Sequence, residues 1–281
     1  MADILRNEPD LWLPLFPWPT ADAHKHSRGR LVVISGDAWS TGAARLAARA
    51  GLRIGAGVVT MLSPTEALAS HAAHLEAVML RGFDDPGQLA DLAVNADAAV
   101  IGPAAGVGER TTLNLFALTG TGAALVIDAD ALTSFQDDPD KLFSVLDRDD
   151  VLTPHPGEFE RLFPGLLDEK GREAAARGAS ERASAVVILK GPATVVAAPD
   201  GRVAVNANGS AWLATAGTGD VLAGFCAGLI AQGMPSFEAA CAAVWIHARS
   251  AGAFGPGLIS EDLPDLVPAA LNALFVAKAV R

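Results

Sequence analysis

A glycine-rich segment in the last third of the chain has the residue types of a phosphate-handling site. Residues 213–224 read LATAGTGDVLAG and pass from a loop into an apolar helix. The glycines let several backbone amides point at one anion, and a helix start adds partial positive charge that favours phosphate. An acid here, Asp220, makes chemical sense if it takes a proton from the group that attacks the phosphate. The alternative is that Asp220 caps its helix, as Thr215 and Thr218 could also do.

Two more segments place charged side chains directly after predicted strands. In LKGPAT, residues 189–194, Lys190 and the amides that follow would hold the phosphates or ribose of a nucleotide; the alternative is a solvated lysine at a turn. In TPHPGE, residues 153–158, two prolines flank His155 shortly before Glu158. Glu158 would reach a magnesium ion through water, because hard cations bound with phosphates use few protein carboxylates. It could equally be a first-turn helix acid, and His155 a packed loop histidine.

Other charged residues allow both a structural and a functional interpretation. Asp128, with Asp130 close behind, ends a predicted strand and would help hold magnesium or a phosphate, but aspartate at a strand-to-helix junction is commonly a cap. Arg45, Arg49 and Arg53 recur every four residues and predict one basic helix face. A solvated face is the simpler explanation, and an acidic dinucleotide or a partner subunit is the alternative.

The elements that must position these side chains alternate along the chain. Short β-branched runs predict strands at residues 31–34, 58–62, 98–101, 125–128, 151–153 and 186–189. Alanine-rich or amphipathic stretches between them predict helices at residues 41–53, 64–73, 109–118, up to 146, 158–162 and to about 184. Consecutive apolar positions in the strands favour a doubly wound, mostly parallel α/β sheet covered by helices on both faces. Ligands of such sheets bind beyond the carboxyl ends of the strands.

The rhythm changes after residue 189. Residues 194–198 and 202–205, joined by Pro-Asp-Gly, predict an antiparallel hairpin at the sheet edge. Residues 217–278 are expected to be nearly all helix, broken near three prolines. We expect a single domain over residues 1–281, with residues 1–23 as an N-terminal extension.

Composition narrows the class of protein. The net charge of −11 and pI near 4.9 argue against a chain that coats nucleic acid or an anionic membrane. The longest apolar run, residues 221–231, is too short to span a bilayer. Cys226 and Cys241 have no metal or redox spacing and are expected to pack in the core. The start of the chain lacks a secretory signal, so we expect a cytoplasmic protein.

Taken together and in this order, these segments resemble the ribokinase-like superfamily and, more narrowly, the ADP-dependent (S)-NAD(P)H-hydrate dehydratase family. The matching stretches are His24-Lys25 with Gly29, residues 42–48 (GAARLAA), 101–103 with Gly106, 127–132 (IDADAL), 152–159 (LTPHPGEF), 189–191 and the glycine loop ending at Asp220. The last alone is typical only of the superfamily. The histidine-bearing PHPGE and the GAAxLAA helix separate the dehydratases from sugar and vitamin kinases.

The resemblance implies a repair reaction on damaged nicotinamide cofactors. ADP would phosphorylate the hydroxyl of hydrated NADH or NADPH, phosphate would leave, and AMP would be released, with Mg²⁺ assisting. Asp220 would be the base, and the amides of Ala216, Gly217, Thr218 and Gly219 would hold the transferred group. Contacts to the adenine nucleotide would come from Gly219 with Lys190, Gly191, Pro192, Ala193 and Thr194. The pocket for the hydrate would be lined by Ala43, Gly106, His155 and Asp220.

The chain departs from the family pattern at three places. His26 stands where glycine is frequent, Gly102-Pro103-Ala104 replaces Gly-Pro-Gly, and Ser210 stands where asparagine is common. We expect epimerisation of the hydrate to come from a separate epimerase, and we expect a homo-oligomer. An ATP-dependent kinase of the same fold, acting on a vitamin-precursor alcohol, is the first alternative. A nucleotide-binding regulatory module without catalysis is the second.

Overall fold

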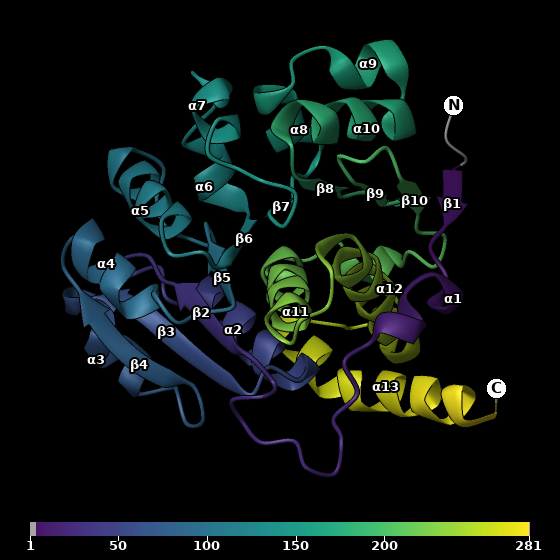
Figure 1. Ribbon diagram of the computed structural model, residues 1–281, viewed down its shortest axis with the longest axis horizontal. Coiled ribbons are helices and arrows are strands. Elements are labelled where there is room, and N and C mark those ends of the chain that lie inside the picture. Colours follow the sequence, from purple (N-terminus) through teal and green to yellow (C-terminus); the bar gives the residue numbers. More distant parts are fainter. Residues whose placement is uncertain (1–3, 281) are drawn as a thin grey trace.

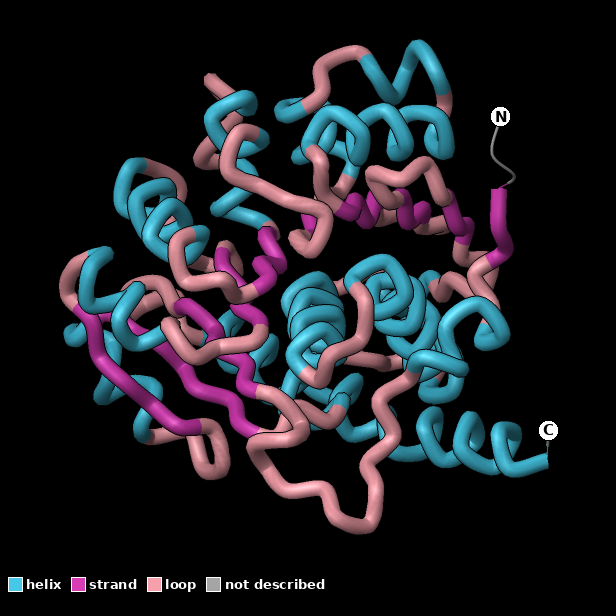
Figure 2. Tube along the Cα trace, in the orientation of Figure 1, coloured by secondary structure: helices cyan, strands magenta, loops and turns pink. Residues whose placement is uncertain are grey.

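The computed structural model describes residues 4–280, which form one layered α/β unit (Figure 1). A single ten-stranded sheet runs through the described part of the chain in the order β1-β10-β9-β8-β7-β6-β5-β2-β3-β4. Helices cover both faces, as Figure 2 shows by the strands lying between two groups of helices. The predicted doubly wound architecture is therefore confirmed.

Seven neighbouring strands form the parallel part of the sheet. They are β2 (Arg30–Ile34), β3 (Val58–Pro64), β4 (Met79–Phe83), β5 (Ala98–Ile101), β6 (Ala124–Ile127), β7 (Val151–Leu152) and β8 (Val186–Leu189). Every residue of β5 and β8 is buried, because helices cover both of their faces. β4 escaped prediction because four of its five residues are at least partly exposed, which removes the continuous apolar run that marks its neighbours.

The antiparallel hairpin forms where it was predicted but does not end the sheet. β9 (Val195–Ala197) pairs with β8 and with β10 (Val203–Val205), and β1 (Ile4–Arg6) adds a parallel strand outside β10. The side-chain amide of Asn7 then donates to Asn206 Oδ1 at 3.0 Å and to the Cys241 carbonyl at 2.8 Å. Trp12, in α1 (Pro9–Trp12), is fully buried. Residues 4–16, expected only as an extension, thus complete the sheet and core; residues 1–3 lie outside the described part.

The helices divide between the two faces. One face is covered by α2 (Gly42–Ile54), α11 (Thr218–Ala231), α12 (Ser236–Phe254) and α13 (Leu263–Val280). The other carries α4 (Pro86–Ala93), α5 (Glu109–Thr119), α6 (Ala129–Thr133), α7 (Pro139–Phe143), α8 (Pro156–Leu162), α9 (Leu166–Lys170) and α10 (Arg172–Ala183). Two short turns, η2 (Thr65–Ala67) and α3 (Leu68–Ala72), precede β4. Within residues 4–280, every helix is too short or too polar to cross a bilayer.

α11 is the central helix of its layer and packs between α2 and α12 (Figure 1). It is buried on almost every side, which agrees with its nearly all-apolar sequence. A side chain at Gly224 would collide with the carbonyl of Ala47 in α2, so glycine is needed for the two helices to approach. This close packing fixes the start of α11, where Asp220 lies, against the sheet.

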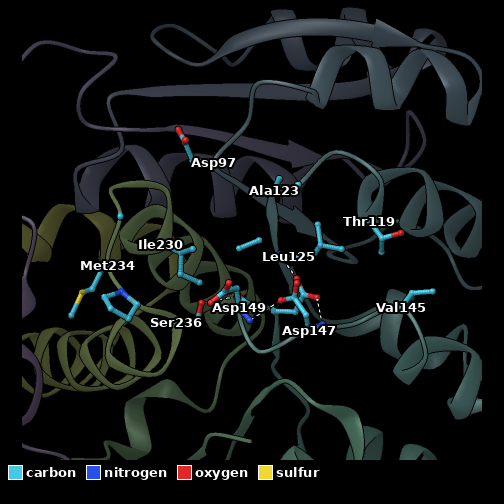
Figure 3. A pocket seen from close by; sticks show the side chains of 15 residues that line it. Asp97, Thr119, Ala123, Leu125, Val145, Asp147, Asp149, Ile230, Met234 and Ser236 are labelled. Atoms are coloured by element: carbon cyan, nitrogen blue, oxygen red, sulfur yellow. Dashed lines mark hydrogen bonds between the residues drawn. The ribbon is translucent and has the colours of Figure 1, made fainter. Parts of the chain in front are cut away.

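A pocket of about 340 Å³ lies at the amino ends of the strands, at the end of the sheet away from the predicted functional segments (Figure 3). Two of the aspartates that line this pocket accept hydrogen bonds from backbone amides. Asp150 accepts from the amides of Leu125 and Asp147 at 2.8 and 2.9 Å, and Asp97 accepts from the amide of Arg30 at 2.7 Å. Burial raises the pKa of Asp150 to about 6. These carboxylates hold the ends of strands together, whereas the segments with chemical potential lie at the carboxyl ends.

Candidate functional site

The glycine loop leads into α11 in a conformation held from several directions. Gly217 stands at the N-cap position with φ 87°, and Asp220 lies in the first helical turn. The Thr218 hydroxyl donates to the carbonyls of Leu213 and Thr215 at 2.9 and 3.1 Å, and the Ser260 hydroxyl donates to the Ala216 carbonyl. The first amides of a helix have no intrahelical acceptor, so this fixed turn presents N–H groups to an anion.

Opposite this turn lies a buried ion pair. Lys190, directly after β8, places Nζ 2.8 Å from Asp128 Oδ1 and 3.9 Å from Glu158 Oε2. Burial opposes the charge of Lys190, but Asp128 and Glu158 outweigh it and raise the pKa of the ammonium. Asp128 occupies the N-cap position of α6, yet its side chain makes no capping hydrogen bond. The capping alternative for Asp128 is therefore not realised, and neither is the alternative of a solvated Lys190.

The electrostatic setting of Asp220 suits proton transfer near neutral pH. Burial, reinforced by the neighbouring carboxylates of Asp128 and Asp130, raises the pKa of Asp220 to about 7, although Lys190 opposes the shift. A carboxyl group with this pKa can both accept and release a proton in the neutral range, as a general base must. The side chain lies in the third position of α11 rather than at its N-cap, so the capping alternative is not realised.

His155 and Glu158 form a reciprocal cap at the start of α8. The amides of Gly157 and Glu158 donate to His155 Nδ1 at 3.0 and 3.2 Å, while the His155 amide donates to Glu158 Oε2 at 2.8 Å. His155 Nε2 lies 3.3 Å from Glu158 Oε1 and is half exposed. Because Nδ1 accepts, a proton of the neutral ring sits on Nε2. The expected first-turn acid is confirmed for Glu158, which leaves its magnesium role a prediction.

The residues fit a magnesium ion that is bound mainly by phosphates. Within residues 4–280, no group of three or more His, Cys, Asp or Glu side chains is arranged to hold a metal. Mg²⁺ in phosphoryl-transfer sites needs only one or two carboxylates, often through water, and takes its other ligands from substrate phosphates and solvent. Burial and repulsion from Asp128 raise the pKa of Glu158, with Lys190 opposing. A cation held by nearby phosphates would stabilise this carboxylate in its charged form.

The loop after β5 is fastened to the start of α6. The Gly106 amide donates to Asp130 Oδ2 at 2.9 Å, and a side chain at Gly102 would collide with the Asp128 carbonyl. Ala104 adopts φ 52°, a conformation that is costly for alanine and that glycine would accept freely. The departure from Gly-Pro-Gly therefore keeps a left-handed backbone at this position. Gly106 is thus fixed beside the acids that follow β6.

Ala43 lies in the first turn of α2, the helix whose Leu46 packs against the glycine loop. The α2 residue Leu46 packs so close that a Cβ on Gly217 would lie 2.7 Å from Leu46 Cδ1. The structure thus brings the first turns of α2 and α11 together, although Ala43 and Asp220 are 177 residues apart by their numbers. The role of Ala43 toward a hydrate stays a prediction.

A pocket of about 520 Å³ unites the two segments predicted to bind a nucleotide. Those segments contribute Lys190, Gly191, Pro192, Thr194, Thr218 and Gly219 to its lining, whereas Ala193, Ala216 and Gly217 are not among the lining residues. Its wall is mostly apolar, with Leu213, Leu222 and Val244, and an apolar wall of this size suits a planar base.

Two residues of this region were missed by sequence reasoning. His247, in α12, lines the pocket; burial lowers its pKa to about 4, and Nε2 has no hydrogen-bond partner among the described residues. Arg172 donates from Nη2 to the carbonyls of Leu189 and Lys190, both at 3.0 Å, and so holds the loop that carries Lys190. Neither belongs to a motif, because Arg172 begins the helix before β8 and His247 lies in α12, beyond the helix that carries Asp220.

Known proteins match this chain over most of its length. A model of the NAD(P)H-hydrate dehydratase family matches residues 31–261. The ADP-dependent (S)-NAD(P)H-hydrate dehydratase of Neisseria meningitidis is 37% identical over 236 residues, covering 82% of this chain and 78% of that protein. The bifunctional NAD(P)H-hydrate repair enzyme Nnr of Salinibacter ruber is 38% identical over 272 residues, covering 89% of this chain but 50% of the relative. The chain thus spans about half the length of such bifunctional relatives.

Solved structures of other proteins superpose on this chain over nearly its whole length. The ADP/ATP-dependent NAD(P)H-hydrate dehydratase of Bacillus subtilis, co-crystallised with ATP/Mg²⁺, superposes with a TM-score of 0.83 at 25% identity, covering 98% of this chain and 100% of that one. A ribokinase-like superfamily protein of Enterococcus faecalis superposes with a TM-score of 0.85 at 24% identity, covering 96% of each chain. The family model over residues 31–261 and relatives that are 37–38% identical over the aligned residues show that the chain belongs to the NAD(P)H-hydrate dehydratase family, and it has a ribokinase-like fold.

Proposed function

We propose that this protein restores NADH and NADPH from the S form of their hydrates, using ADP and giving AMP and phosphate. The observation that carries the proposal is Asp220, whose pKa is raised to about 7 in the first turn beyond the glycine loop. A base poised near neutral pH beside free helix amides is what phosphoryl transfer to a hydroxyl requires. The dehydratases of the same family support the choice of hydroxyl.

In the first step, the hydroxyl of the hydrate loses its proton to Asp220, and its oxygen attacks the terminal phosphorus of ADP. The new O–P bond replaces the bond to AMP, which leaves. The amides of Ala216 to Gly219 would hold the phosphoryl group in flight, and Lys190, kept protonated by Asp128 and Glu158, would balance its charge. Mg²⁺, when bound, would neutralise phosphate oxygens, with Glu158 holding it through water.

In the second step, phosphate leaves the ring with the bonding electron pair. Hydroxide is a poor leaving group and phosphate a good one, so phosphorylation of the hydroxyl lowers the barrier to elimination. The lone pair of the ring nitrogen assists departure, and loss of a proton from the adjacent carbon restores the ring double bond. His155 Nε2, half exposed beside Glu158, would contact the hydrate, as would Ala43 and Gly106.

The partners follow from this chemistry. The reaction consumes only one epimer, so a separate epimerase would supply it; relatives of about twice this length that are named bifunctional support a linked second activity. A cytoplasmic location and a homo-oligomeric state complete the proposal.

The test is absorbance at the reduced-nicotinamide band after mixing the protein with hydrated NADH, Mg²⁺ and either ADP or ATP, with phosphate release followed in parallel. A rise that requires ADP and equals the phosphate released supports the proposal. A stable phosphate ester formed from ATP and a small alcohol, with no rise in absorbance, would instead identify a kinase. The Asp220→Asn variant, which should turn over much more slowly, is the control.

A further inference from the structure

A groove of about 890 Å³ runs beside α2, on the far side of α11 from the nucleotide pocket. Four arginines line it, Arg28, Arg45, Arg49 and Arg53, against two glutamates, Glu76 and Glu261. This positive excess contrasts with the net charge of −11 for the whole chain. The basic helix face predicted from the four-residue spacing is therefore the wall of a concave surface. A concave basic surface concentrates the field and attracts anions.

The four arginines differ in how far their charge is already neutralised. Arg49 and Arg53 both bind Asp265 of α13, at 2.6 and 2.8 Å. Arg45 forms no ion pair with any described residue, and Arg28 Nε is enclosed without a hydrogen-bond partner. The positive field of Arg45 extends inward: after burial, it is the second factor that lowers the pKa of His71. Uncompensated charge thus remains in the groove at Arg28, beside Gly55, and at Arg45, close to the start of α2.

The end of the groove at Arg45 borders the glycine loop. Leu46 lines the groove and also packs against Gly217, and Glu261, another lining residue, follows Ser260, whose hydroxyl binds the Ala216 carbonyl. From Gly42 to Gly55 the groove follows α2 for roughly 20 Å, at about 1.5 Å per residue. The nucleotide pocket lies against α12, so the groove is the concave surface on the other side of α11.

We propose that this groove binds the phosphate-bearing adenosine half of the dinucleotide hydrate, with Arg45 contacting its pyrophosphate. The inference rests on the proposed function, because it assigns the remote half of the same substrate. With the reacting ring at Asp220 and ADP against Lys190 to Thr194, the rest of the dinucleotide needs a separate path that accepts negative charge. Guanidinium pairs well with pyrophosphate oxygens through two parallel hydrogen bonds. Binding energy gained there positions the ring without touching it.

The decisive variant is Arg45→Gln, which keeps length and polarity but removes the charge. Its KM for the hydrates of NADH and NADPH should rise about ten-fold, the loss of one charged hydrogen-bonded contact, with kcat and the KM for ADP unchanged. The hydrate of reduced nicotinamide mononucleotide lacks the pyrophosphate and adenosine, so its KM should not change. Arg148→Gln, an exposed arginine at the opposite edge of the sheet, is the matched control. Unchanged KM values for the dinucleotides, or an equal rise for the mononucleotide, would overturn the proposal.

Binding without turnover separates this inference from the function on which it rests. Titration with NADPH, the unreactive product, should give about ten-fold weaker binding to Arg45→Gln than to wild type, with a weaker dependence on salt. If wild type repairs no hydrate but NADPH binding still depends on Arg45, the groove assignment holds and the reaction is wrong. If repair is present and NADPH binding ignores Arg45, the groove assignment fails. Dissociation of an oligomer by Arg45→Gln, with dinucleotide KM values unchanged, would show an interface between copies and also refute it.

Discussion

Lys190 Nζ and Asp128 Oδ1 lie 2.8 Å apart, so the lysine after β8 reaches past β7 to the acid after β6. The side chain of Asp128 is 2% exposed and that of Lys190 20%. Two buried charges are tolerated when they are paired with each other, and the carboxyl group of Glu158, 3.9 Å from Lys190 Nζ, adds a second acid beside the lysine. After burial itself, repulsion from Asp128 and Asp130 raises the pKa of Asp220, and Lys190 opposes the shift.

The first prediction concerns the pH dependence of catalysis. The proposed base Asp220 must be deprotonated, so kcat/KM should rise with pH through about 7 and level off above it. Asp128→Asn removes the largest repelling charge and should move this limb to lower pH, whereas Asp91→Asn on exposed α4 should not. Asp220→Asn should bind ADP but lose about 10²–10⁴-fold in turnover, the usual contribution of a positioned base. Full activity of that variant would exclude Asp220 as the base.

The second prediction is that Asp220 lowers the free energy of unfolding above neutral pH. The pKa of Asp220 is about 7 in the folded protein, above the ordinary value of 3.8 for an aspartate, so the folded state holds the proton more tightly than the unfolded chain. Stability is therefore lost as pH rises from about 4 to 7 and stays low above 7. Asp220→Asn should be more stable than wild type at pH 8, by on the order of 2–4 kcal/mol, and nearly equal at pH 4. Urea unfolding at both pH values measures this, and an equal gain at both would contradict the linkage.

Breaking the buried ion pair should be more damaging than removing it. Lys190→Met leaves Asp128 buried without its partner, and we expect a loss of about 3–5 kcal/mol in the free energy of unfolding. The double variant with Asp128→Asn should recover most of that stability but not ADP binding, since the cation is still missing. A double-mutant cycle by chemical denaturation gives the coupling energy. Additive losses would show that the two side chains do not depend on each other.

Two glycines of the loop should respond differently to alanine. A Cβ on Gly219 would lie 3.4 Å from Lys190 Nζ and 3.6 Å from Asp128 Oδ2, which the fold tolerates, but the methyl group would enter the nucleotide pocket. Gly219→Ala should therefore fold normally and bind ADP at least ten-fold more weakly. Gly217→Ala meets Leu46 and Ser260 at 2.7 and 2.9 Å with φ 87°, so it should lower the melting temperature. Calorimetry would measure the melting temperature and the ADP affinity of both variants. A lower melting temperature for Gly219→Ala but not for Gly217→Ala would contradict the prediction.

His155 needs a variant that spares its capping role. Its Nδ1 accepts two amide hydrogen bonds, so alanine would remove a helix cap worth about 1 kcal/mol and confuse the result. His155→Asn keeps an N-cap acceptor but removes Nε2. We expect a higher KM for the hydrate, an unchanged KM for ADP and little change in stability. An effect confined to ADP would place His155 in the nucleotide pocket instead.

The sequence alone determined the parallel sheet and the segments that matter. Consecutive apolar residues at 98–101 and 186–189 favour strands that are covered on both faces. Glycine or charged residues directly after strands marked the functional end of the sheet. These are local properties, because a residue's type restricts its own backbone and its immediate neighbours. The motif residues 153–158 and 216–220 needed no tertiary information to be recognised.

Only the tertiary structure decided which side chains meet. Lys190 pairs with Asp128 because the order of strands puts β8 two places from β6, and strand order is not encoded in local periodicity. Likewise, β1 adds a strand outside the hairpin. Asp265 of α13 pairs with both Arg49 and Arg53, whereas Arg45 has no ion pair among residues 4–280. The raised pKa of Asp220 depends on burial and on acids from another strand end, so no reading of its own segment could supply it. Long-range packing sets the electrostatics of this site.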